Sequence, residues 1–450
     1  MQAILRRIRR RACRAATAVF LFNAAIGLVT PADAAAQGIG ADTVLRLGDA
    51  YRALATRNPG VAAARAFADA TAAMIPSASL PPDPQVQLGF MNYALPGLSP
   101  MDPLGMIQLQ VMQMIPLPGK LALAGQAARA EGELSRRRAD GALWTAHREL
   151  AGAFYALYES DQQLAVARRT TALLADIEAT AQALYRVGQA QQADVLRAQV
   201  ELARMSEDTL RLVAMRQGTA AQFNAQLDRD ADATVPSPVL PAFPVDVPPM
   251  DSLVGLALRD RPDVRAGEAA VTASDRQRAL ADRDVWPDLA VGVQLARPTA
   301  GMTNTFMGSL MVGASIPVFA RSRQDKAREA AAAMLAMNSA ELRVTQADTR
   351  AAVIGAYAAL MRARRLAALY RFTVIPQADA AATSALASYR VGQVDFTTVL
   401  DDRMAVNRYQ QALYTLQADE GKAWADLEAL VARDLMNADS TAVPAAGGDR

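Results

Sequence analysis

The sequence YRVGQ occurs twice in this chain, at residues 185–189 and at residues 389–393. Three further pairs of short sequences stand in the same order along the chain, again about 200 residues apart: NPGV and RPDV from residues 58 and 261, PQV and PDL from residues 84 and 287, and IPL and IPV from residues 115 and 316. One such match is weak, but four in register predict a tandem duplication. We therefore expect a first repeat at 37–234 and a second repeat at 250–436.

A proline-rich segment joins the two repeats. Residues 235–249 hold six prolines, so this segment can form neither a helix nor a central strand, and we expect an extended linker. The last residues, 437–450, are small and polar, and we expect a disordered tail there.

Composition excludes several classes of protein. The 450 residues are 52% hydrophobic and 20% charged, with a formal net charge of +2. A disordered chain is less apolar, and a nucleic-acid-binding protein is usually more basic. With one cysteine and one histidine, a disulfide scaffold and a Cys/His zinc site are excluded. The sequence has no glycine-rich phosphate loop and no G-x-S-x-G motif, so we expect neither an enzyme nor a resident cofactor.

The N-terminus has the pattern of a secretory signal peptide. Six arginines and no acid occupy residues 1–14, an apolar run follows at 15–30, and small residues follow that run. We expect residues 1–36 to be removed, with cleavage after Ala34 or Ala36 fitting equally well. The alternative is an N-terminal membrane anchor, although the apolar run is shorter than the ~20 residues that a spanning helix needs.

Two very long helices are predicted in each repeat, after one helix and two strands. Residues 119–235 contain no proline and are rich in strong helix formers. We expect helices at about 121–185 and 194–227, and their counterparts at 324–389, with one break at Pro376, and 396–435. Helices of this length bury little surface alone, so they must pair as coiled coils.

Two windows almost free of charge have a period of two instead. Residues 84–116 and 288–317 each read as a hairpin of strands of about ten residues, with one apolar face and one small or polar face. Within residues 84–119 and 289–320 the lone charges are Asp102 and Arg297, and we expect both in the connecting loops. This pattern is typical of membrane strands, whereas a soluble hairpin usually carries charges on its wet face. Four strands cannot close a membrane barrel, so subunits must share one.

At this point the chain resembles the TolC family of outer-membrane efflux proteins. The resemblance rests on the duplicated plan, on the Ile-Pro sequences that end the strands, and on the motif that begins with Tyr-Arg-Val-Gly after the first long helix of each repeat. It covers about residues 42–435. It implies an α+β fold, in which long coiled-coil hairpins form a periplasmic tunnel and four strands per subunit enter a shared trimeric outer-membrane β-barrel. It also implies a homotrimer that works with a periplasmic adaptor protein and an inner-membrane pump, the RND type being expected.

The resemblance implies an exit duct that passes substrate from the periplasm to the exterior. Copper or silver ions are one candidate substrate, because residues 111–121 look like family members that serve copper or silver efflux. A drug-efflux duct and a type I secretion duct are alternatives. A periplasmic helical adaptor is a more remote one, since it would lack the two strand pairs.

Each repeat carries a tip motif at the turn between its long helices. The family pattern G-x5-D-V-L matches Gly188 and Asp194 in the first repeat, while the second repeat has Gly392, Thr398 and Asp401, with Asp402 beside it. A ring of carboxylates in a narrow pore attracts cations, and the alternative role of these acids is to complement a helix dipole. Two interpretations exist for the tip residues Tyr185, Arg186, Tyr389 and Arg390. They form a gate or a contact with the adaptor, or they only pack against and cap the end of the long helix.

Methionines are concentrated on the polar face of the predicted strands. We expect six of them to face the lumen: Met91, Met106, Met112, Met114, Met307 and Met311. Thioethers suit soft ions such as Cu(I) and Ag(I), so these residues are candidate metal ligands. The alternative is that they only fill irregular space. His147 stands alone on a long helix, so we expect it to be packed or solvated rather than a ligand.

Overall fold

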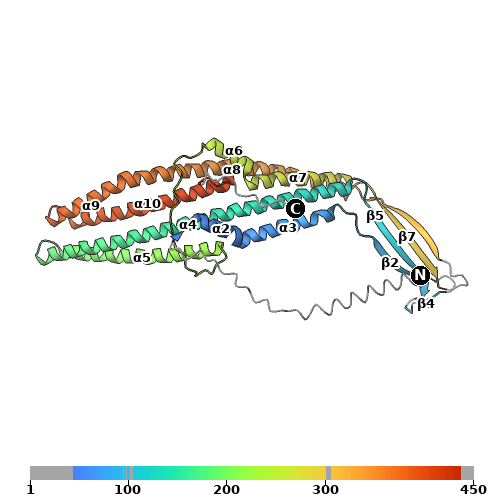
Figure 1. Ribbon diagram of the computed structural model, residues 1–450, viewed down its shortest axis with the longest axis horizontal. Coiled ribbons are helices and arrows are strands. Elements are labelled where there is room, and N and C mark those ends of the chain that lie inside the picture. The colour runs from blue at the N-terminus through green and yellow to red at the C-terminus, as the bar shows by residue number, and fades with distance from the viewer. Residues whose placement is uncertain (1–43, 95, 98, 102–104, 300–305, 437–450) are drawn as a thin grey trace. The chain divides into compact units, whose positions relative to one another are not determined.

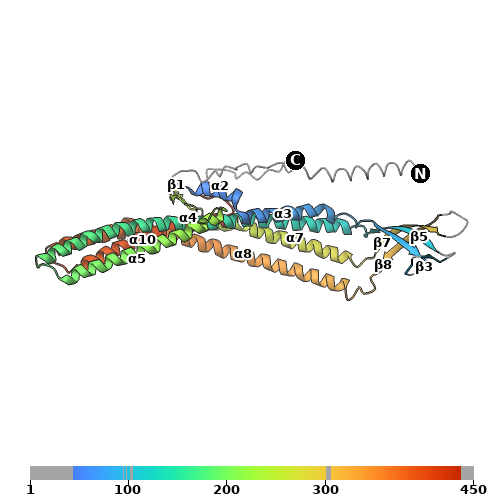
Figure 2. The same cartoon turned by 90° about the horizontal axis from the view of Figure 1, so that it is seen from below.

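The computed structural model describes residues 44–94, 96–97, 99–101, 105–299 and 306–436. The predicted signal peptide and the predicted C-terminal tail lie outside the described residues. Within them, the predicted α+β class is confirmed: long helices and one four-stranded sheet dominate the structure (Figures 1 and 2).

The order of elements repeats along the chain. The first set is α2 (Leu47–Arg57), α3 (Pro59–Ala78), β2 (Gln85–Met91), β5 (Met106–Ile115), α4 (Lys120–Arg186) and α5 (Gln192–Gln226). The second set is α6 (Met250–Asp260), α7 (Pro262–Arg283), β7 (Asp288–Pro298), β8 (Met307–Ser315), α8 (Gln324–Leu369), a π-helix η1 (Tyr370–Val374), α9 (Ile375–Arg390) and α10 (Phe396–Val431). The short strands β3 (Tyr93–Ala94) and β4 (Ser99–Pro100) pair within the first hairpin connection.

Two helices, not the expected one, precede each strand pair. The break lies at Asn58 before Pro59, and at Arg261 before Pro262. A proline pushes the preceding residue out of the helical region, and Asn58 and Arg261 have ψ angles of 120° and 125°. The Asn58 side chain then caps α3 by accepting a hydrogen bond from the backbone N–H of Val61 at 2.9 Å.

A π-helix stands where the sequence suggests a simple break. The helix continues through η1, and Pro376 lies in the first turn of α9, where its missing N–H is tolerated. A π-turn inserts one residue into a helix. Buried residues of the two repeats accordingly match at an offset of 203 before η1, as in Leu157 and Leu360, and at 204 after it, as in Ala181 and Ala385.

The strands form one antiparallel sheet in the order β2-β5-β7-β8. The two hairpins therefore meet along β5 and β7, which pair from Met106 with Pro298 to Ile115 with Leu289. Arg297 lies inside β7 and not in the loop expected for it, and its guanidinium sits 5.8 Å from the centre of the Phe306 ring. A cation over an aromatic face explains how the strand keeps this charge at its end. The linker is extended, and its β6 (Ser237–Pro238) pairs in parallel with β1 (Val44–Leu45).

A buried lysine ties the helices to the sheet. Lys120, at the start of α4, donates from Nζ to Asp288 Oδ1 at 2.9 Å and to the Trp286 carbonyl at 3.0 Å. The same Asp288 oxygen accepts from the backbone N–H of Leu117 at 3.1 Å. Because Lys120 belongs to the first repeat and Asp288 to the second, this cluster fixes both hairpins to the base of α4.

The helical core lies along α10, which contacts both α4 and α8. Trp424 and Leu427 of α10 pack with Leu360 of α8 and Leu253 of α6, and all are fully buried. Gly421 of α10 faces Tyr155 of α4, where a Cβ would stand only 2.2 Å from the tyrosine ring. The helices approach this closely because glycine has no side chain.

Candidate functional site: the helical tip and the faces of the sheet

The two tip turns have the same backbone geometry. Gly188 and Gly392 both have φ of +74°, a conformation that glycine adopts without strain. In each turn the glycine N–H donates to the tyrosine carbonyl at 3.0 Å, and the next N–H donates to the carbonyl five residues back at 2.9 Å. This pair of backbone hydrogen bonds is a Schellman cap. The capping interpretation of the Tyr-Arg-Val-Gly sequence therefore describes the backbone in both repeats.

The side chains of the two identical tips differ sharply. Tyr389 is only 7% exposed, whereas its counterpart Tyr185 is 46% exposed. Tyr389 packs against Phe396, with ring centroids 5.4 Å apart, in a cluster that includes Ile177 and Ala181 of α4. The second tip is thus covered by the first repeat of the same chain, and no described residue covers the first tip in the same way.

Asp194 joins the two tips. It lies in the first turn of α5, where it forms a reciprocal capping pair with Gln191, and it accepts a hydrogen bond from the Tyr389 hydroxyl at 3.4 Å. Burial, followed by the nearby Asp194 carboxylate, raises the pKa of Tyr389 to about 12. The tyrosine therefore remains a neutral donor over the physiological pH range.

Thr398 and Asp401 lie on the exposed side of α10, three residues apart and so on one face of the helix. Asp402 beside them is partly buried. Neither aspartate lies in the first helical turn, which holds no acid, so complementing the helix dipole accounts for them poorly. Arg186 is exposed at the first tip, and Arg390 lines a groove with Asp176, Asp379 and Arg403 at the second.

All six predicted methionines share one face of the sheet. In an antiparallel sheet, directly paired residues point to the same side. Met91 pairs with Met106, Met112 pairs with Gly292, and Gly292 pairs in turn with Met311. Met114 stands opposite Ala290, and Met307 opposite Ala296. The same face carries the glutamines Gln85, Gln87, Gln108, Gln110 and Gln294.

The opposite face is apolar and exposed. Its residues include Val86, Leu88, Leu109, Val293, Leu310 and Val312, which are between 43% and 74% exposed in the single chain. Exposed apolar surface of this extent marks an interaction with a membrane or a partner. A sheet with one apolar and one glutamine- and methionine-rich face has the alternation of a membrane strand whose second face meets water.

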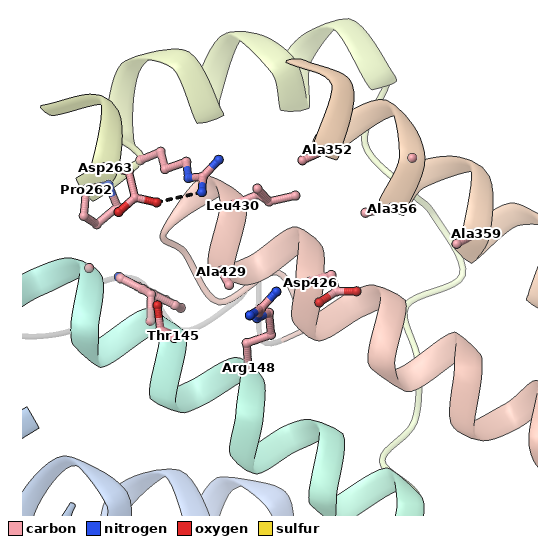
Figure 3. Close-up of a pocket in the computed structure, with 14 residues that line it drawn as sticks. Thr145, Arg148, Pro262, Asp263, Ala352, Ala356, Ala359, Asp426, Ala429 and Leu430 are labelled. Carbon is pink, nitrogen blue, oxygen red and sulfur yellow. Dashed lines mark hydrogen bonds and ion pairs between the residues drawn. The ribbon is translucent and has the colours of Figure 1, made fainter. Parts of the chain in front are cut away.

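A cavity of about 400 Å³ opens between α4, α7, α8 and α10 (Figure 3). Arg148 of α4 and Asp426 of α10 lie on the same side of it. Burial raises the pKa of Asp426, and the positive charge of Arg148 opposes this effect. Gly141 lets the start of α7 approach α4, because a Cβ there would lie 3.6 Å from Pro262 Cβ and 3.1 Å from an Asp263 oxygen. We did not anticipate this cavity from the sequence.

Two further titratable side chains are largely buried: His147 of α4, and Glu428 near the C-terminal end of α10. His147 stacks on Tyr51 with ring centroids 4.5 Å apart, and burial lowers its pKa to about 4, which confirms it as a packed residue. The Glu428 carboxylate accepts hydrogen bonds from the backbone N–H groups of Leu435 and Met436 at 2.9 and 3.0 Å. Burial raises the pKa of Glu428 to about 8.

No helix among the described residues is both long enough and apolar enough to cross a membrane.

The second repeat matches the model of a known protein family, from within α6 to just past the end of α10, with both strands included. The matching residues are 253–433, and the model is that of the outer membrane efflux protein family. This confirms the family expected from the sequence, together with its general function as an efflux duct and its outer-membrane location. The match leaves the substrate open, and it does not favour the periplasmic adaptor alternative.

Solved structures extend the likeness to both repeats. The outer-membrane channel OprN has a TM-score of 0.70 and 20% identity, covering 86% of this chain and 89% of that chain. The outer membrane protein VceC of Vibrio cholerae scores 0.73 at 17% identity, with coverage of 86% and 95%. The MtrE outer membrane channel of Neisseria gonorrhoeae, in its open state, scores 0.69 at 16% identity, with coverage of 86% and 89%. These structures show the fold; no curated protein sequence matches the chain.

The raised pKa of Glu428 predicts a pH-dependent stability. The unfolded chain ionises this group near pH 4.5 and the folded chain near pH 8. The folded state therefore binds more protons between these values, and the free energy of unfolding falls as pH rises from about 4.5 to about 8. In Glu428→Gln the group cannot ionise. The melting temperature of this variant, relative to wild type, should rise across that interval and level off above it. The exposed substitution Glu207→Gln is the control, and parallel wild-type and E428Q curves would contradict the buried state of Glu428.

Proposed function

We propose that the chain is one subunit of a homotrimeric exit duct, which passes substrate from the periplasm across the outer membrane. In this proposal each subunit gives four strands to a twelve-stranded barrel. The α4–α5 and α9–α10 hairpins form a periplasmic tunnel, and its tip meets a periplasmic adaptor of an inner-membrane pump of the RND type. The described sheet supports the sharing of strands, because β2 and β8 are open edges and an open edge has no hydrogen-bonding partner in lipid.

The observation that carries this proposal is the unequal burial of equivalent residues. Leu400 is 8% exposed where the first repeat of its own chain covers it, whereas its counterpart Leu196 is 53% exposed. Tyr389 and Tyr185 differ in the same way. The second repeat buries these residues against the first repeat of its own chain, and the first repeat leaves the equivalent residues exposed. The second repeat of another copy is suited to cover them. Repeating this contact head to tail closes a ring.

The packing of α4 on α7 shows which surfaces would meet between copies. Within one chain, Gly141 of α4 receives Pro262 and Asp263 at the start of α7. Adjusting for the offset between the repeats, the equivalent residues are Val344 on α8 and Pro59 and Gly60 on α3. Within the chain, the glycine lies on the long helix and faces Asp263. Between copies, the glycine would lie on α3: Val344 of α8, which is 57% exposed, would face Gly60 of a neighbour. Such an exchange preserves the packed volume.

The same comparison holds about two turns away from Gly141 on α4. Leu134 of α4 packs on Ala266 and Ala269 of α7 within the chain. The equivalent residues are Met337 on α8, which is 48% exposed, and Ala63 and Ala66 on α3. A large apolar side chain again faces two alanines. The two positions together support a contact of α8 with α3 of the next copy.

Cysteine pairs test the proposed ring. In Val344→Cys/Pro59→Cys, with Cys13 replaced by serine, oxidation should link one copy to the next because the two positions face each other only between copies. Non-reducing gels should show species that stop at three subunits. The matched control Gly141→Cys/Pro262→Cys should close a bond within one chain and leave the apparent mass at one subunit, since the two Cβ atoms would lie 3.6 Å apart. Absence of linked species beside a closed control, or a ladder beyond three, would sink the trimer.

A second test concerns the tip of the tunnel. If Asp401 and Asp402 line the pore, replacing both with alanine removes negative charge from its narrowest part. Single-channel conductance in planar bilayers should rise, and the preference for cations should fall. Asp208→Ala is the control, because Asp208 lies on α5 about 20 Å along the helix from the tip. Equal conductance and selectivity in both variants would assign these aspartates to the surface of the helix alone.

A further inference from the structure

Two methionines from different hairpins converge over a glycine on the polar face of the sheet. Met112 on β5 and Met311 on β8 are two strands apart, with Gly292 of β7 between them in the same row. A Cβ at Gly292 would lie 3.6 Å from Met112 Cγ and 3.5 Å from Met311 Cε. Both side chains therefore lean over the glycine from opposite sides. A methyl group at this position would contact both side chains and occupy the space between them.

The atoms that approach Gly292 are bonded directly to sulfur. In methionine both Cγ and Cε are attached to Sδ, so each thioether lies within one bond of an atom that flanks the glycine. Thioethers are uncharged, soft ligands that prefer Cu(I) and Ag(I) to zinc or magnesium. Among the described residues, no group of three or more His, Cys, Asp or Glu residues is placed to hold a metal ion, so the sulfurs are the candidate ligands.

We propose that Met112 and Met311, brought together across Gly292, form a binding site for a soft univalent cation, Cu(I) or Ag(I). This inference rests on the proposed exit duct, because the shared face of the sheet is the one we assign to its lumen. It names the class of substrate that this face recognises. The site uses no charged ligand, so an ion can leave it as well as enter it, as conduction requires.

The surroundings of the pair extend the site along the strands. The next row holds Gln87, Gln110 and Gln294, and the Gln294 amide donates to Gln108 Oε1 in the row beyond. Further along, Met91 and Met106 form a directly opposed pair. With about 3.4 Å per residue, the two methionine pairs lie roughly 20 Å apart along β5. Glutamine carbonyls between two pairs of sulfurs give a neutral, polar path for a cation.

Silver binding to the purified full chain in detergent tests the site. The probe is Ag⁺, titrated into chloride-free buffer and followed by calorimetry. Met112→Leu/Met311→Leu keeps the volume of the side chains and removes both sulfurs, so the affinity of the tightest site should fall by more than about tenfold. Gly292→Ala should weaken binding in the same direction, because a methyl group stands between the two side chains.

The matched control removes two methionines from exposed helical positions. Met74 and Met334 are 70% and 49% exposed on α3 and α8, and Met74→Leu/Met334→Leu should bind Ag⁺ as wild type does. If the M112L/M311L variant binds silver as tightly as wild type, or if the control loses as much, the inference is wrong and these methionines only fill space.

Conductance separates this inference from the proposed duct. Wild type and M112L/M311L are compared in planar bilayers with potassium as the carried ion. If both conduct equally and only silver affinity changes, the duct and the site are both supported. If wild type binds Ag⁺ through these methionines and forms no channel, the duct fails while the site stands. If channels form and silver affinity is unchanged by the substitutions, the duct stands and the site fails.

Discussion

The structure depends on one constraint: a strand in lipid must find a hydrogen-bonding partner for every backbone N–H and C=O group. Among the described residues, four strands in the order β2-β5-β7-β8 leave two edges without a partner. In the proposed ring other copies close those edges, and the helical halves then meet between copies as well. The unequal burial of Tyr185 and Tyr389, and of Leu196 and Leu400, is the counterpart of the open edges at the helical tip. Both ends of α4 therefore point to the same assembly.

Successive side chains of a strand point to opposite faces, so a few residues give the sheet two different surfaces. Valine, leucine and phenylalanine occupy one face, and methionine, serine and most of the glutamines and glycines occupy the other. The register couples the hairpins, because β5 and β7 pair over their length and Lys120 fixes Asp288 at the base of α4. The closeness of Met112 and Met311 depends on this register, since a slip of one residue would move Gly292 to the other face.

Repetition and periodicity could be predicted from the sequence, and contacts between repeats could not. The strands, the long helices and the glycine turns follow from local signals: a period of two, the absence of proline, and glycine at positive φ. The split at Pro59 and Pro262 also has a local cause, since proline restricts the residue before it. The position of Arg297 inside β7 and the burial of Tyr389 depend on Phe306 and Phe396, partners that spacing does not reveal. The pairing of Gly141 with Asp263 corresponds to a pairing of Val344 with Gly60, and this becomes visible only when the repeats are aligned at the offset of 203.

The central claim is that one face of the sheet meets lipid and the other meets an aqueous lumen. Single cysteines placed at Met91, Met112 and Met311, and at Val86, Leu109 and Leu310, test it most directly in cells exposed to a small, membrane-impermeant thiol reagent. The account predicts labelling at the three methionine positions and protection at the three aliphatic positions, because adjacent residues of a strand point to opposite faces. Equal labelling of both sets, or labelling of the aliphatic set alone, would contradict it.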